Sequence, residues 1–288
     1  MMPAHQTMAI GRLGRVSRSA LQWRLMVLWM LALLLPTALM AVPFWRILAS
    51  QLDHSVHAAR WAQQLDALVI ADLLARFAEN GMVLAQAGVT ALVLTLLLSP
   101  LLSASVLVAA RSEQTPGFVK LIQGGVQEYP RMLRMLLWAA VPLGLAVGLG
   151  AAGLFLAKKF AASAILESDA EWVGRAALAL LALLVLLALT SVDAARAQLA
   201  FYHRRRSVVH AWWRGCRVLR QRALSMLGCY LLISLVGLGL AAALTTLRLA
   251  LPGWFWFGFG LVLAQFAVAA IVWMRIARLL VLIDLSRP

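Results

Sequence analysis

Charged residues are scarce in this sequence: Asp, Glu, Lys and Arg make up only 13% of the 288 residues, whereas 63% are hydrophobic. A chain of this composition has too little polar surface to cover a water-soluble globule. About 17–25 consecutive apolar residues cross a bilayer core as a helix. The sequence has six stretches that reach this length, so it predicts a single all-α membrane domain, 1–288, with spans at about 25–45, 82–110, 135–157, 174–192, 223–247 and 254–274.

Cysteine and catalytic motifs are also nearly absent. The two cysteines, Cys216 and Cys229, do not form a disulfide framework. The sequence has no zinc-protease helix, no paired intramembrane aspartates, no nucleophile beside a base and no glycine-rich phosphate loop. Ionisable residues are missing from the middle of every span, where ion-coupled transporters usually keep them. These absences predict a protein that is not an enzyme and uses no cofactor, and they weigh against a proton-coupled transporter.

The charges that are present lie mostly on one side of the predicted spans. With the N-terminus inside, the inner segments hold 19 Lys and Arg and four acids, whereas the outer loops hold seven of each. The formal net charge of +15 therefore belongs to the inner side, which is the positive-inside pattern. Arg outnumbers Lys 23 to 3, which is typical of a GC-rich bacterial genome. We expect a bacterial inner-membrane protein with both termini in the cytoplasm.

The start of the chain has features of a signal peptide. Arg12, Arg15 and Arg18 precede an apolar run, as in the basic region of such a peptide. The run is longer than a signal-peptide core, and no small-residue cleavage site stands clearly at its end. We therefore expect an uncleaved first span.

Three segments between the spans carry helical patterns. We predict an outer insertion, 46–80, with a helix on the membrane surface, and two inner amphipathic helices, 116–130 and 207–222. The apolar faces of the two inner helices match at an offset of 90 residues: Phe118, Leu121, Ile122, Val126 and Tyr129 against Val208, Ala211, Trp212, Cys216 and Leu219. Similar tetrapeptides also close spans two, four and six: Val-Ala-Ala-Arg at 108–111, Asp-Ala-Ala-Arg at 193–196 and Arg-Ile-Ala-Arg at 275–278. These offsets predict an internal repeat of three helical hairpins.

The repeat resembles a known group of bacterial membrane proteins. Helical hairpins with Asp-Ala-Ala-Arg at the end of span four, followed by an Arg-rich amphipathic helix, are similar to the uncharacterised YciC-like and glycerophosphodiester-phosphodiesterase membrane-domain group. The resemblance covers about residues 80–288. It implies a six-helix membrane fold and supplies no catalytic residue.

Asp193 and Arg196 stand one helical turn apart at the inner end of span four. An unpaired carboxylate held in hydrocarbon would cost several kcal/mol. We therefore predict that the two form an ion pair. A structural role at the helix end is favoured over a proton or substrate relay.

The strongest local signal is a cluster of basic residues and tryptophans between spans four and five: Arg204, Arg205, Arg206, Trp212, Trp213, Arg214 and Arg217. In a soluble protein this mixture would suit nucleic acid, but beside two spans it suits anionic lipid headgroups. Determination of topology explains part of the charge equally well. We predict contact with membrane lipids, anionic lipids in particular, and no nucleic acid.

Two weaker patterns are interpreted structurally. Three residues of the outer insertion resemble metal ligands: Asp53, His54 and His57. No fourth ligand is evident, so a solvated helix face is the simpler interpretation and we predict no metal site. Four glycines of span three predict a small-residue face for close helix packing: Gly144, Gly148, Gly150 and Gly153.

Three classes of function fit these observations. The leading hypothesis is a non-enzymatic membrane protein that acts through helix packing, lipid contact and a soluble cytoplasmic partner at the inner helices. The alternative is a transporter, or a permease-like subunit of a transport complex whose inner helices couple to an energy-providing protein. A gene neighbour encoding a nucleotide-binding ATPase would favour this alternative. A lipid-modifying enzyme comes third, because it needs a buried polar cluster that the sequence does not reveal.

Overall fold

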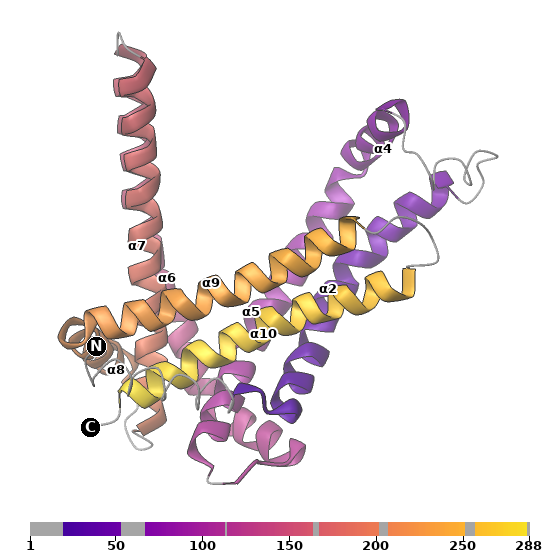
Figure 1. Cartoon of the computed structure of the whole chain (residues 1–288). Coiled ribbons are helices and arrows are strands. Elements are labelled where there is room, and N and C mark those ends of the chain that lie inside the picture. Colours follow the sequence, from indigo (N-terminus) through magenta and orange to yellow (C-terminus); the bar gives the residue numbers. More distant parts are fainter. Residues whose placement is uncertain are drawn as a thin grey trace, which may run out of the picture. The chain divides into compact units, whose positions relative to one another are not determined.

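The computed structural model describes residues 20–52, 67–112, 114–163, 167–201, 207–250 and 257–286 (Figure 1). Within these ranges the chain is helical and forms no strand. Of the eight helices in the described residues, six are long and apolar enough to cross a membrane. The predicted all-α fold with six candidate transmembrane helices is thereby confirmed.

The six long helices are α2 (Trp23–Leu52), α5 (Gly81–Arg111), α6 (Phe118–Ser163), α7 (Glu167–Phe201), α9 (Ala223–Ala250) and α10 (Phe257–Leu285). Two shorter amphipathic helices are α4 (Ala67–Glu79) and α8 (Val208–Gln221). Large apolar side chains cover the outside of the long helices; Leu145, Leu235 and Phe266 are 63%, 68% and 61% exposed. Such a surface fits lipid, because a helix satisfies its own backbone hydrogen bonds and needs no water.

The chain divides into two compact units. Unit 1 comprises Met1–Ala20, Ser103–Ser234 and Arg275–Pro288, and unit 2 comprises Leu21–Leu102 and Leu235–Met274. In unit 1, α6 and α7 pack against each other. In unit 2, the parts of α9 and α10 that belong to this unit lie side by side (Figure 1), and Ala241 of α9 shares a small apolar core with Ala267 and Ala270 of α10.

The glycines of α6 differ from the predicted packing face. A Cβ at Gly144 or Gly148 would meet nothing within 4 Å, so this pair makes no close helix contact. Gly150 instead lies directly against Leu181 of α7, where a Cβ would collide with the leucine side chain. Gly150 is about half a turn away from Gly148 around the helix. The face of α6 that packs on α7 is therefore not the face that carries Gly144 and Gly148.

The first inner segment, 116–130, is not a separate helix. It is the first part of α6, a helix of 46 residues that continues through Pro130 and Pro142. At about 1.5 Å per residue this helix is roughly 69 Å long, more than twice the thickness of a bilayer core. A proline removes only one backbone donor and bends a helix that packing holds together, so α6 continues through Pro130.

The apolar stripe of that segment is only partly buried. Leu121 is buried, but Ile122 and Val126 are 45% and 58% exposed. The buried face contains Gly125 and Glu128 instead. A hydrophobic stripe indicates the protein core only when water is the solvent, and beside a bilayer the same stripe can face lipid.

The structure describes both ends of the predicted outer insertion, 46–80. Helix α2 continues past residue 46 to Leu52, and α4 is followed after Asn80 by α5. The ring centroids of Phe44 and Phe77 lie 5.3 Å apart, and this contact joins α2 to α4. Residues 53–66 lie outside the described part of the chain, and with them Asp53, His54 and His57, which resemble metal ligands but were interpreted as a solvated helix face.

Candidate functional site

The ion pair predicted at the end of span four is present in unit 1. Nη1 of Arg196 donates to Oδ1 of Asp193 at 2.8 Å, and the two side chains are 20% and 19% exposed. Both residues are on α7, three positions apart, where helical geometry brings side chains together. The pairing reduces the cost of placing the carboxylate in a poorly solvated position.

Two residues from other helices complete this cluster. The hydroxyl of Tyr230 on α9 donates to Oδ2 of Asp193 at 3.2 Å. The guanidinium of Arg278 on α10 lies 4.6 Å from the centre of the Tyr230 ring, and its Nη1 is 3.4 Å from the phenolic oxygen. Tyr230 is only 3% exposed, so its hydroxyl depends on these partners. Asp193 thus links α7 to α9, and Tyr230 links α9 to α10.

The inner polar cluster, Asp193, Arg196, Tyr230 and Arg278, has an excess of positive charge. It contains two guanidiniums and one carboxylate, and Arg275, one turn before Arg278, lies within electrostatic range of Asp193. Both oxygens of Asp193 accept hydrogen bonds, one from Arg196 on the same helix and one from Tyr230 on α9, so the carboxylate is held between the two helices. The geometry favours the structural interpretation of Asp193.

A second ionic cluster joins α5, α6 and α7. The guanidinium of Arg111 donates to the backbone oxygens of Ala200 and Leu199 at 2.8 Å each, and to Oε1 of Glu128 at 2.9 Å. Nη1 of Arg131 donates to the other oxygen of Glu128 at 2.7 Å. Carbonyls in the last turn of a helix lack intrahelical partners and favour a cation. Arg111 therefore closes the end of α7 while Glu128 holds it in place.

The two inner amphipathic segments contact the preceding helix in the same manner. A Cβ at Gly124 of α6 would lie 2.6 Å from Val108, in the Val-Ala-Ala-Arg end of α5. A Cβ at Gly215 of α8 would lie 2.8 Å from the backbone nitrogen of Ala195, in the Asp-Ala-Ala-Arg end of α7. In each case a glycine packs on the end of the preceding helix, before its arginine. The two glycines are 91 residues apart and contact different positions of the tetrapeptides, so the contacts do not establish the predicted offset of 90, and the internal repeat stays a prediction.

Helix α8 is a fixed amphipathic helix. Its N-cap is Ser207, whose hydroxyl accepts from the His210 backbone nitrogen. Three contacts hold its inner face: Gly215 lies on α7, Nε1 of Trp212 donates to Oγ of Ser191 at 3.2 Å, and the Trp212 ring packs edge-on against Trp138, 5.8 Å away. Burial raises the pKa of the Cys216 thiol, so this side chain is neutral at physiological pH.

The opposite face of α8 is exposed and basic. Trp213 is 61% exposed, and Arg217 and Arg220 are exposed beside it. Only some of the residues predicted to contact anionic lipid therefore lie on this exposed face. Trp212 is turned toward the protein, where its indole N–H donates to Ser191, and Arg214 is half-buried. Arg204, Arg205 and Arg206 lie outside the described residues.

Sequence reasoning missed several residues of these clusters. Tyr230 and Glu128 received no role, although a tyrosine in an apolar span and an acid inside a basic segment are both signals of buried polar pairing. Arg278 was noted only as a repeat arginine. Within the described ranges, no group of three His, Cys, Asp or Glu is placed to hold a metal ion.

Comparisons with protein-family models, curated proteins and solved structures gave no match. The functional argument therefore rests on the geometry of the chain itself. The resemblance to the YciC-like group stays a prediction.

Proposed function

We propose that the chain is a non-enzymatic protein of the bacterial inner membrane that binds anionic phospholipid on its cytoplasmic side through α8. The observation that carries the proposal is the exposed face formed by Trp213, Arg217 and Arg220 on a helix whose other face is fixed to α7. The positive-inside pattern supports a cytoplasmic position for α8 and for both termini.

The physical basis is electrostatic and interfacial. Each basic residue near an anionic leaflet contributes about 1 kcal/mol to binding. An exposed tryptophan favours the headgroup region, where its ring is apolar and its N–H is solvated. Because contacts with α7 already hold α8, its two arginines need no ordering of the helix when they bind lipid.

The test compares two pairs of charge-removing substitutions in protein purified in native lipid particles. Arg217→Gln with Arg220→Gln removes two charges from α8, whereas Lys158→Gln with Lys159→Gln removes two exposed charges from the far end of α6. Mass spectrometry measures the ratio of phosphatidylglycerol to phosphatidylcholine that remains bound. At about 1 kcal/mol per charge, we expect the α8 pair to lower anionic enrichment by roughly tenfold or more, and the lysine pair to leave it unchanged.

Equal enrichment in both variants would contradict the proposal. The same spectra detect soluble proteins. A cytoplasmic protein retained in stoichiometric amount, and lost from the α8 variant, would instead support the permease-subunit alternative with α8 as the docking helix.

A further inference from the structure

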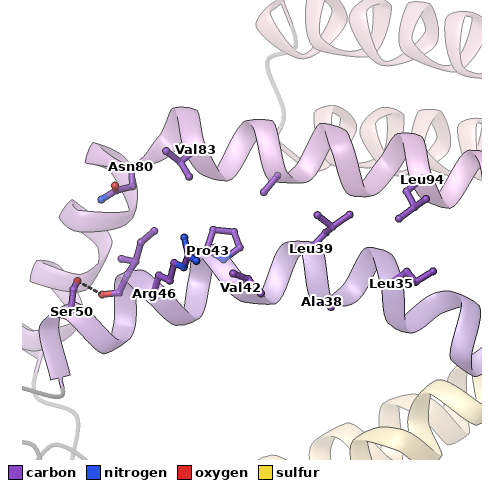
Figure 2. A pocket seen from close by; sticks show the side chains of 12 residues that line it. Leu35, Ala38, Leu39, Val42, Pro43, Arg46, Ser50, Asn80, Val83 and Leu94 are labelled. Atoms are coloured by element: carbon purple, nitrogen blue, oxygen red, sulfur yellow. Dashed lines mark hydrogen bonds between the residues drawn. The ribbon is translucent and has the colours of Figure 1, made fainter.

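Unit 2 contains a groove of about 800 Å³ between α2 and α5 (Figure 2). This volume is within the usual range of about 300–1,000 Å³ for small-ligand sites. Most of its wall is apolar, with Leu35 and Leu39 on α2 facing Ala87 and Leu94 on α5. The polar side chains Arg46, Ser50 and Asn80 gather at one end (Figure 2).

Of these three polar groups, Arg46 is the one that carries a positive charge. The Ser50 hydroxyl donates to the Ile47 carbonyl at 2.8 Å, and the Asn80 amide donates to the Arg76 carbonyl at 2.9 Å. Arg46 is exposed and has no carboxylate partner among the described residues. A guanidinium in this setting binds a phosphate through several parallel hydrogen bonds.

The apolar part of the groove has the length of one leaflet. Leu35 and Arg46 are 11 residues apart, which is about 16 Å along a helix. Half of a hydrocarbon core of ~30 Å is about 15 Å. An acyl chain lying along α2 would therefore fill the groove from its apolar end and bring its headgroup to the depth of Arg46.

We propose that this groove binds one phospholipid, with an acyl chain between α2 and α5 and the phosphate at Arg46. The site is separate from α8, so this proposal stands or falls independently of the one above. A second protein helix is a poorer occupant, because apolar helix surfaces gain no hydrophobic free energy by leaving lipid for each other. A water-filled groove would be costly at this depth, whereas an acyl chain matches its lining.

The inside of the groove offers a matched pair of substitutions. Ala87 lines the groove, whereas Ala85 is exposed about half a turn away on the same helix. Ala87→Trp fills the groove and Ala85→Trp adds the same ring to the lipid-facing side. Arg46→Gln removes the charge while keeping a polar side chain.

The experiment uses the full chain in phosphatidylcholine nanodiscs with phosphatidylglycerol that carries a photoactivatable diazirine in the middle of one acyl chain. After irradiation, mass spectrometry maps the labelled peptides. We expect labelling of α2 and α5 within 35–50 and 80–94 in the native chain and in Ala85→Trp, and loss of that labelling in Ala87→Trp. Arg46→Gln should weaken competition by unlabelled phosphatidylglycerol.

Equal labelling of the groove in the two tryptophan variants would overturn the proposal. So would competition by oleate but not by phosphatidylglycerol, since the occupant would then be a free fatty acid. If Ala87→Trp does not assemble, Ala38→Trp fills the groove from the α2 side and the same labelling decides.

Discussion

Asp193 illustrates how a single carboxylate is stabilised at the end of a membrane helix. It accepts from Arg196 on its own helix and from Tyr230 on α9. Hydrogen bonds to a charged group contribute about 1.5–3 kcal/mol, more than neutral ones, because burial strengthens the electrostatic interaction. The carboxylate therefore stabilises the packing of α7 against α9.

Replacing Asp193 with Asn should lower stability, because the side chain keeps its shape but loses the charge that pairs with Arg196. The expected loss is about 1–3 kcal/mol, which corresponds to a melting temperature lower by roughly 2–8 °C in detergent. Asp72→Asn, at an exposed position of α4, is the control and should change stability by less than about 0.5 kcal/mol. Unchanged melting of Asp193→Asn with loss of a physiological activity would instead favour the relay interpretation.

At this scale the sequence predicts only the local part of the site. The Asp193–Arg196 pair follows from a three-residue spacing, which any helix brings together. Tyr230 lies 37 positions from Asp193 along the chain, and Arg278 lies 48 positions beyond Tyr230. Their meeting depends on how helices pack, and helical periodicity carries no information about that.

At the scale of elements, glycine at position 215 determines how closely α8 can approach α7. A Cβ there would be 2.8 Å from a backbone nitrogen and 3.0 Å from two backbone carbons, none of which can move aside as a side chain could. Close approach of backbones through small residues is a common way in which membrane helices associate. The contact places Trp212 beside Ser191 and leaves Trp213 exposed.

We predict that Gly215→Ala weakens the attachment of α8, despite the higher helix propensity of alanine. Gly174→Ala in α7 is the matched control, because a Cβ at Gly174 would meet nothing within 4 Å and alanine favours a helix by about 1 kcal/mol. Amide hydrogen exchange should become faster in α8 of the first variant and stay the same, or slow locally, in the second. Unchanged exchange in α8 of Gly215→Ala would show that the close contact is not what holds the helix.

Helix boundaries and faces were harder to predict than helix existence. The six spans follow from their lack of charge, because hydrocarbon excludes charge at any point along them. The orientation of the 118–130 stripe could not be read in the same way, since protein and lipid accept the same apolar side chains. Glu128 was the better indicator, because a carboxylate turns toward its partner Arg111.

For the whole molecule, the distribution of charge predicts the topology. The formal charge of +15 arises from the four segments assigned to the inner side, and the outer loops are neutral. With an even number of spans, the same pattern predicts that both termini lie on that inner side. Reversing the protein would place this charge on the side that positive-inside topology avoids.

Single-cysteine variants can test this orientation after Cys216 and Cys229 are replaced by Ser. A cysteine at Gln221 should react with a membrane-impermeant maleimide only after the cells are permeabilised, and one at Ala162 should react in intact cells. Both positions are exposed, so differences in labelling report the side of the membrane. The reversed labelling pattern would contradict the predicted orientation and the cytoplasmic position of α8.

The contacts of Arg111 also establish an order in time. During synthesis Arg111 emerges 17 residues before Glu128 and 88 residues before Leu199, so its carboxylate partner exists long before the carbonyls that it caps. Chains fold progressively from the N-terminus as they are made. α5 and α6 can pack together first, and the end of α7 then binds to a guanidinium that Glu128 already orients. The contact between α5 and α6 thus forms the binding site for the end of α7 while the chain is still being synthesised.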